Sequence, residues 1–181
     1  MTDVTGNALI AMSIKGLMLD PVSNSPIVVL KDDEEKFFLP IWVGIFEANA
    51  IALQLENIST PRPMTHDLLR NMISELDARV TRIVINDLRE STFFAQIRLL
   101  AGDKMLEIDA RPSDAIALAL RTEAPIYVAQ SVLDQAHVEA VDRPDLAGAI
   151  TPATPEGEDS EEKVKKWFEN LSPEDMGKYK M

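Results

Sequence analysis

The pattern that most limits the fold is a run of short β-type segments followed by an apolar helical segment, which occurs twice along the chain. The first set comprises residues 8–19, 26–32, 36–44 and the helical segment 46–56. The second set comprises residues 80–88, 91–100, 104–110 and the helical segment 113–122. Short connections between consecutive strands favour antiparallel pairing. We therefore predict an α+β fold whose antiparallel or mixed sheet is built from two three-strand meanders with packed helices.

The two sets can be aligned with each other. A shift of 65 positions places AIALQL (50–55) over AIALAL (115–120), and Ile41–Val43 over Leu106–Ile108. This alignment indicates an internal duplication of a unit of three strands and one helix. Chance similarity between two apolar helices is the alternative explanation.

The predicted helices differ in how they should meet the sheet. Both repeated helices are apolar on nearly all sides, so we expect them to be buried, with Glu47 and Asp114 at their polar N-terminal ends. Another helix is predicted over residues 65–78, with Thr65 as its N-cap. The apolar stripe of this helix, which we expect to face the core, consists of Leu68, Leu69, Met72, Ile73 and Leu76.

The chain divides into a domain and a C-terminal extension. A strand over residues 124–129 and a helix over 131–140 close the predicted domain, which we place at 1–141. Residues 142–160 are rich in proline, glycine and acidic residues and are typical of a linker. Residues 161–181 are predicted to form a short amphipathic helical tail. Its apolar stripe, expected to dock on the domain or on a partner, consists of Val164, Trp167, Phe168 and Leu171.

The composition argues against several classes of protein. A net charge of −12 disfavours nucleic-acid binding through a broad basic face, so such binding needs a local patch or metal ions. The chain has no cysteine, which excludes disulfides and thiolate catalysis. No apolar run is long enough to span a bilayer, and the N-terminus does not resemble a signal peptide. We therefore expect a cytoplasmic protein without membrane contact.

Several well-known motifs are missing from the sequence. Neither the phosphate-binding loop GxxxxGK[ST] nor the dinucleotide motif GxGxxG occurs, and there is no GxSxG nucleophile elbow. The two histidines, His66 and His137, are far apart in the sequence and lack the spacing of a zinc site. These observations disfavour a nucleotide-fold enzyme and a histidine-based metal site.

Polar residues at the starts of the predicted helices have two interpretations. Ser113 is a good N-cap and Asp114 complements the helix dipole, so this group can serve only to begin the helix. The helix starts also combine carboxylates with His66 and the nearby Arg62 and Arg111. Carboxylates bind Mg²⁺ or Mn²⁺, a guanidinium binds phosphate, and an imidazole transfers protons. Together these groups suit metal-assisted phosphoryl transfer.

The same residues carry a resemblance to a known family. The segments LPIWVGIFEANAIA (39–52), RPMTHDLL (62–69) and EIDARPSDAIALALRTEAPIYV (107–128) resemble the signature blocks of the bifunctional nuclease domain family. The resemblance implies an α+β fold, hydrolysis of both DNA and RNA, and a homodimer. The positions that match the family motifs are Glu47, His66, Asp67, Asp109, Arg111, Ser113 and Asp114.

Two hypotheses follow for the function. The first is a metal-dependent nuclease, in which Arg111 holds the scissile phosphate, His66 acts as base or acid, and Glu47 and Asp114 complete the catalytic set. The residues expected to bind Mg²⁺ or Mn²⁺ are Glu47, Asp67, Asp109 and Asp114. The second is a non-enzymatic dimeric binding or regulatory module, in which Asp109, Arg111 and Asp114 form a salt-bridged cap.

Overall fold

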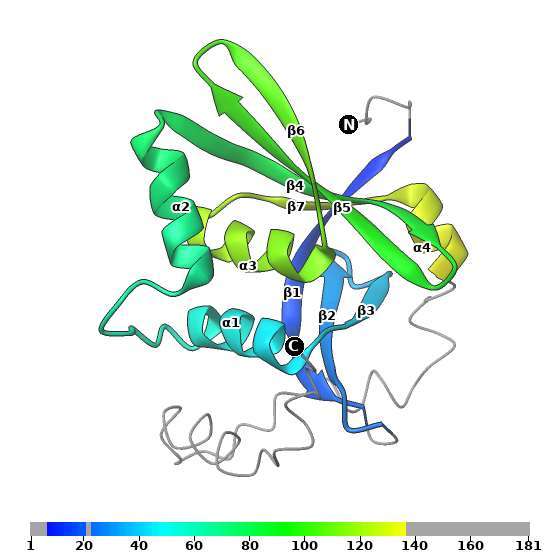
Figure 1. Ribbon diagram of the computed structural model, residues 1–181. Coiled ribbons are helices and arrows are strands. Elements are labelled where there is room, and N and C mark those ends of the chain that lie inside the picture. Colours follow the sequence, from blue (N-terminus) through cyan, green and yellow to red (C-terminus); the bar gives the residue numbers. More distant parts are fainter. Residues whose placement is uncertain (1–6, 21–22, 137–181) are drawn as a thin grey trace.

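A computed structural model describes residues 7–20 and 23–136 and contains one mixed seven-stranded sheet (Figure 1). Its strands, in the spatial order β3-β2-β1-β7-β4-β5-β6, pair antiparallel except for β4 and β7. The strands are β1 (Leu9–Leu19), β2 (Pro26–Asp32), β3 (Phe38–Trp42), β4 (Ala78–Arg89), β5 (Thr92–Ala101), β6 (Lys104–Ala110) and β7 (Ile126–Ala129). The predicted α+β class and both meanders are confirmed.

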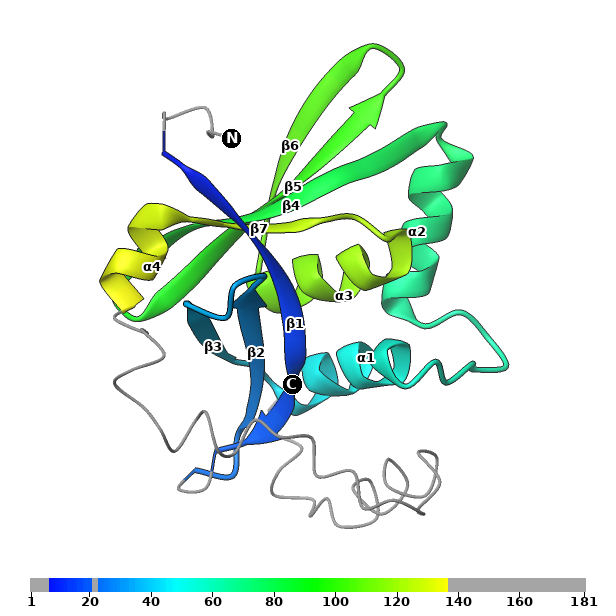
Figure 2. The same cartoon turned by 180° about the vertical axis from the view of Figure 1, so that it is seen from behind.

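The short strand β7 joins the two meanders. It pairs antiparallel with β1, where Leu9 lies opposite Ala129, and parallel with β4, where Ile83 lies opposite Ile126. The long strand β1 pairs with β7 through its first residues and with β2 through the rest, and it bends at a bulge beside Gly16. In Figure 2 β1 crosses β7, where the two meanders meet. The strand predicted to close the domain is therefore central in the sheet.

Three of the four helices in the described part of the chain gather beside one face of the sheet (Figure 1). The helices are α1 (Ile45–Leu55), α2 (Thr65–Glu75), α3 (Pro112–Thr122) and α4 (Gln130–Ala136). As predicted, α3 is almost entirely buried. The expectation that α1 is also buried is confirmed only in part, because Ala48, Ala50 and Ile51 are buried, Phe46 is exposed and the other residues of the helix are half-buried.

The hydrophobic core lies between the sheet and α3. Ile116 and Leu118 of α3 are fully buried, as are Ile83, Ile85 and Val128 of the central strands. β-branched residues pack well on a pleated sheet, and the alanines of α3 let that helix approach the strands closely. This packing fixes the position of the N-terminal end of α3.

The predicted N-caps of two helices lie too late in the sequence, by two residues in α3 and by one residue in α2. Arg111, with extended backbone, is the N-cap of α3, whereas Ser113 lies inside the first turn. Proline suits the first helical position because its ring fixes φ and its missing N–H would be unpaired there, so Pro112 sets the boundary. Met64 is the N-cap of α2 and Thr65 is its first helical residue.

The predicted orientation of α2 is also wrong. Its stripe was expected to face the core, but only Ile73 packs against the core cluster, and no residue of α2 is buried. The four exposed members of the stripe are Leu68, Leu69, Met72 and Leu76. The reason is tertiary, because His66 and Asp67 form contacts with α3 that fix the rotation of α2.

Some sequence predictions fall outside the described residues. They concern His137, the linker at 142–160 and the tail at 161–181. No helix among the described residues is long and apolar enough to cross a membrane.

Candidate functional site

A network of charged side chains joins the N-terminal ends of α1 and α3. Arg111 donates two hydrogen bonds to Asp114, from Nε to Oδ2 at 2.7 Å and from Nη2 to Oδ1 at 3.1 Å. Arg111 Nη1 also lies 2.8 Å from Oε1 of Glu47. The side chain of Arg111 is still 64% exposed, so the guanidinium is accessible to a ligand.

The local backbone explains how these three side chains meet. Pro112 begins α3 and leaves Arg111 extended, and Asp114 then falls in the first turn beside it. Glu47 occupies the first turn of α1, where a carboxylate complements the helix dipole. A Cβ built on Gly44 would collide with the carboxylate of Glu47, so the glycine leaves room for that carboxylate beside Arg111.

His66 adds a third helix to the network. Its Nε2 lies 3.2 Å from Oδ1 of Asp114, and its side chain is only 12% exposed. His66 comes from the first turn of α2, which packs beside α3. Asp114 therefore lies between a guanidinium and an imidazole and can orient both.

The electrostatics of the network keep Asp114 ionised. Burial opposes the charged form, but hydrogen bonds from Arg111 and His66 outweigh it, so the pKa of Asp114 is below its ordinary value. The pKa of Arg111 is raised, chiefly by its hydrogen bond to Asp114 and further by Glu47. The guanidinium thus carries a permanent positive charge at the surface.

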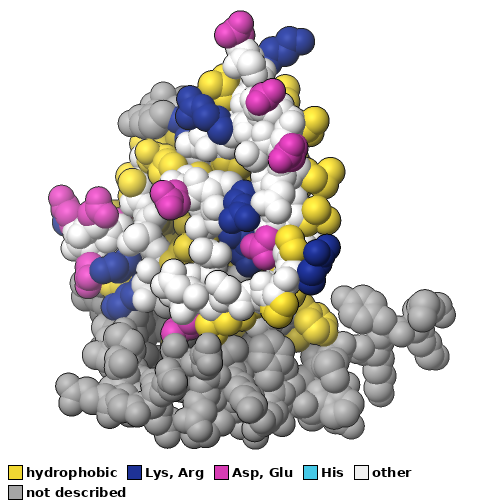
Figure 3. Space-filling model, turned by 90° about the vertical axis from the view of Figure 1, so that its left-hand side faces the viewer, with side chains coloured by type: hydrophobic (Ala, Val, Ile, Leu, Met, Phe, Trp, Pro, Cys, Tyr) yellow, Lys and Arg dark blue, Asp and Glu magenta, His cyan; other side chains and the backbone are white. Residues whose placement is uncertain are grey.

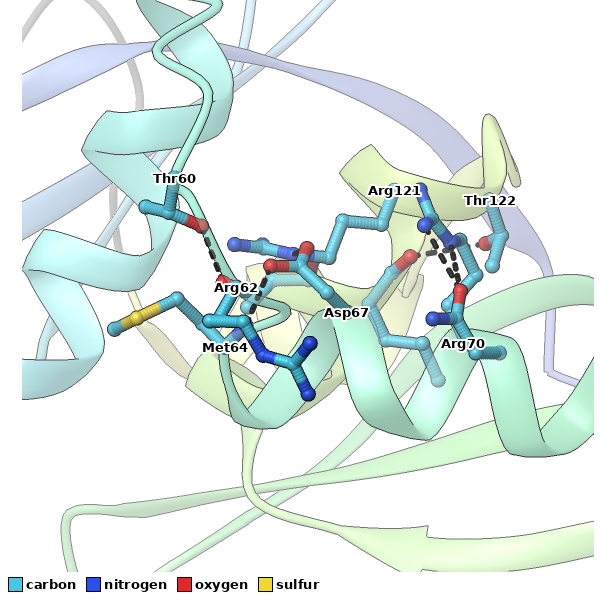
Figure 4. Close-up of polar contacts among 10 residues, drawn as sticks. Thr60, Arg62, Met64, Asp67, Arg70, Arg121 and Thr122 are labelled. Carbon is cyan, nitrogen blue, oxygen red and sulfur yellow. Dashed lines mark hydrogen bonds and ion pairs between the residues drawn. The ribbon is translucent and has the colours of Figure 1, made fainter.

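Asp67 belongs to a second, separate ion pair. Its Oδ1 accepts a hydrogen bond from Nε of Arg121 at 2.6 Å, and its Oδ2 accepts the backbone N–H of Met64 at 2.9 Å. Figure 4 shows Asp67 between these two partners, with Arg62 close by. Burial opposes ionisation, but these bonds outweigh it and lower the pKa of Asp67. The pair fastens α2 to α3.

Asp109 and Ser113 do not join the network. Asp109 is exposed on β6 opposite Gln96, and its side chain forms no hydrogen bond or ion pair with any residue that the structure describes. Ser113 is buried in the first turn of α3. Of the seven predicted positions, the structure joins Glu47, His66, Arg111 and Asp114.

Sequence reasoning did not single out Arg121 or Gly44. Arg121 is 2% exposed and lies seven residues after Asp114, on the same side of α3. An arginine on the buried side of an apolar helix indicates that a carboxylate from another element reaches it. This signal could have shown that Arg121 needs a carboxylate partner, but not that the partner is Asp67. The role of Gly44 depends on a tertiary contact and leaves no signal in the sequence.

The donor set decides whether a metal ion fits. Glu47 and Asp114 provide carboxylate oxygens, which Mg²⁺ and Mn²⁺ prefer, but these carboxylates already pair with Arg111. A guanidinium at the same oxygens would repel a divalent cation. Within residues 7–20 and 23–136, no three His, Asp or Glu side chains are grouped as ligands. The network as arranged therefore does not fit a metal ion.

The fold and this network define an α+β domain with an arginine–carboxylate–histidine site at three helix N-termini. The sequence model of the bifunctional nuclease domain family matches residues 28–141 of this chain. The chain therefore belongs to the bifunctional nuclease domain family.

Individual relatives differ in how much of their length is matched. An uncharacterized protein of Mycobacterium tuberculosis is 38% identical over 163 residues, which cover 90% of this chain and 95% of that protein. Bifunctional nuclease 2 of Arabidopsis thaliana is 26% identical over 135 residues, covering 73% of this chain and 40% of the plant protein. Bifunctional nuclease 2 of Oryza sativa subsp. japonica is 30% identical over 111 residues, or 59% of this chain and 34% of that protein.

Proposed function

We propose that the protein hydrolyses phosphodiester bonds of DNA and RNA at the network formed by Glu47, His66, Arg111 and Asp114. The observation that carries this proposal is the exposed guanidinium of Arg111, bound on one side by two carboxylates and next to a histidine. The names of the plant relatives, bifunctional nuclease, support the same reaction class.

Phosphate binding is the role of Arg111. Three of its five N–H donors are used by Asp114 and Glu47, and the remaining two can bind the oxygens of a phosphate. Two further exposed arginines, Arg62 and Arg70, lie near Asp67 of α2, the helix that also carries His66. Arg62 forms no ion pair with any described residue. Their positive charge supports phosphate binding in a chain whose overall charge is −12.

Proton transfer is the role of His66. When Nε2 donates its proton to Asp114, Nδ1 is the nitrogen that can accept a proton from water. The water oxygen then forms a bond to phosphorus while the bond from phosphorus to the leaving oxygen breaks. The proton taken from water resides on His66, and solvent protonates the leaving oxygen. Arg111 stabilises the charge that develops on the phosphoryl oxygens.

The experiment is a cleavage assay on end-labelled single-stranded DNA, double-stranded DNA and RNA. A general base contributes about 10²- to 10⁴-fold to a rate, so His66→Gln should reduce cleavage by about 100-fold or more. The matched control is Asp103→Asn in the exposed β5–β6 turn, which should cleave at the wild-type rate. Equal cleavage by wild type and His66→Gln after identical purification would contradict the proposal.

A non-enzymatic role has one observation in its favour. Both carboxylates of the network are paired with Arg111, so the network can serve to hold α1 and α3 together. In that case the wild-type protein cleaves neither DNA nor RNA, and Arg111→Gln lowers the melting temperature without any activity to lose. The cleavage assay therefore separates the two roles.

The expected homodimer and cytoplasmic location are also proposals. In the described sheet, β6 has a neighbouring strand on one side only and exposes Leu106 and Ile108, which suits pairing with a second copy. Sedimentation of wild type and Ile108→Lys tests this, because the charge should give a monomer. A wild-type monomer at all concentrations would contradict it. Cell fractionation tests the location.

A further inference from the structure

The outer face of α2 is an apolar surface without a partner among the described residues. Leu68, Leu69, Met72 and Leu76 are all exposed, and Met72 is 54% exposed. In Figure 3 hydrophobic side chains, in yellow, lie along the right-hand edge of the molecule, next to charged side chains. A contiguous apolar patch of this kind usually marks a docking surface.

We propose that the chain's own C-terminal segment, residues 161–171, docks on this outer face of α2. The segment has its apolar residues at helical spacing i, i+3, i+4 and i+7, namely Val164, Trp167, Phe168 and Leu171. At a rise of about 1.5 Å per residue, this stripe spans about 10 Å as a helix, and the stripe from Leu68 to Leu76 spans about 12 Å. The two stripes therefore match in length and in character.

The stretch of chain between α4 and the docking segment is long enough for the segment to reach α2. The described part of the chain ends at Ala136 in α4, and residues 137–163 precede the stripe. A chain segment of that length can span at most about 90 Å. A domain of this size has a radius of gyration of about 14 Å, so the segment can reach α2 from the end of α4.

The acidic residues before the docking segment favour a position near the start of α2. Residues 142–162 contain one basic residue, Arg143, and seven acidic residues. Near the first turn of α2 lie the exposed Arg62 and Arg70, and the charge of Arg70 helps to lower the pKa of Asp67. The acidic run can therefore lie along these arginines while the apolar stripe lies on α2.

The docking has a consequence for nucleic-acid binding, which rests on the proposed function. An acidic segment at Arg62 and Arg70 competes with a nucleic-acid phosphate for the same positive charges. Because the segment is tethered, its effective concentration is about millimolar, enough to occupy a weak site for most of the time. The docked segment would then lower the affinity for nucleic acid.

The docking is tested with the full-length chain carrying Trp42→Phe, so that Trp167 is the remaining tryptophan. Docking predicts emission at short wavelength and poor quenching by acrylamide. The variant Met72→Gln should shift the emission to longer wavelength and increase quenching. The matched control is Met105→Gln, because Met105 is 55% exposed on β6 and should leave Trp167 unchanged. Circular dichroism melting checks that both variants fold.

Three results would overturn the inference. In the first, Trp167 is freely quenched in the parent protein; in the second, Met72→Gln and Met105→Gln have the same effect. The third is protection of Trp167 that disappears on dilution together with a dimer, because a second copy would then supply the segment. Activity is a separate readout, and Met72→Gln should raise cleavage by roughly two- to tenfold. Protected Trp167 without any cleavage would refute the proposed function and leave the docking intact.

Discussion

Arg111 Nη1 lies 2.8 Å from Oε1 of Glu47, and this contact connects the first turn of α1 to the residue that begins α3. The two helices follow the two meanders of the sheet, one from each half of the chain. The candidate site therefore depends on both halves being in place, and four predictions follow the contacts that hold it.

Gly44→Ala should disturb the site without unfolding the protein. The new Cβ would collide with the end of the flexible Glu47 side chain, which must then leave Arg111. A displacement of about 1 Å can reduce a rate by about 100-fold, so we expect cleavage to fall by about tenfold or more. The control is Gly16→Ala in β1, where nothing lies within 4 Å of the new Cβ. Equal cleavage by the two variants would show that the position of Glu47 does not matter.

Asp67→Ala should destabilise the fold by about 2–4 kcal/mol, because Arg121 would keep its buried charge without the carboxylate that balances it. Urea denaturation measures the change in the free energy of unfolding. Asp87→Ala removes the surface ion pair with Arg89 and should cost less than about 1 kcal/mol. If Asp67→Ala lowers the free energy of unfolding no more than Asp87→Ala does, the ion pair between Asp67 and Arg121 does not fasten α2 to α3.

Acid should weaken the fold through Asp67 and Asp114. Both carboxyl groups have a pKa below the ordinary value of 3.8 in the folded state. The unfolded chain then binds more protons, so their stabilising contribution is complete well above pH 3.8 and is lost as the pH falls through the lowered pKa values. Urea denaturation between pH 6 and pH 3 should show a steeper loss for wild type than for Asp67→Asn. Parallel curves would rule out a contribution from Asp67.

Arg111→Gln should increase the affinity for Mn²⁺. The substitution removes the guanidinium that occupies Glu47 and Asp114 and leaves two carboxylates facing each other without a cation. Isothermal titration calorimetry compares the variant with wild type, and Arg89→Gln on the surface serves as the control. Tighter Mn²⁺ binding by wild type than by Arg111→Gln would show that a metal ion fits beside the arginine after all.

The parts of the structure that local chemistry determines could be predicted from the sequence. Tight turns near Glu90 and Gly102 indicate the second meander, and residue types at helix starts indicate Glu47, His66, Arg111 and Asp114 as candidates. The same reasoning also selected Asp67 and Ser113, which do not join the network, because tertiary contacts decide which helix starts meet. The rotation of α2 could not be predicted, because it depends on Arg121, which lies 54 residues after Asp67. The central position of β7 in the sheet could not be predicted either, because the sequence of a four-residue strand does not indicate which strands it pairs with.

The position of β7 has a consequence for synthesis on the ribosome. The strand edge of β1 that faces the second meander is paired by Ile126–Ala129, which emerges more than one hundred residues later. The backbone groups along this edge of β1 therefore stay unpaired until nearly the whole domain has left the exit tunnel. Contacts between such distant segments slow folding, and an open edge can pair with another chain meanwhile. Slow translation after residue 44 would lengthen this exposed interval and favour aggregation of the nascent chain.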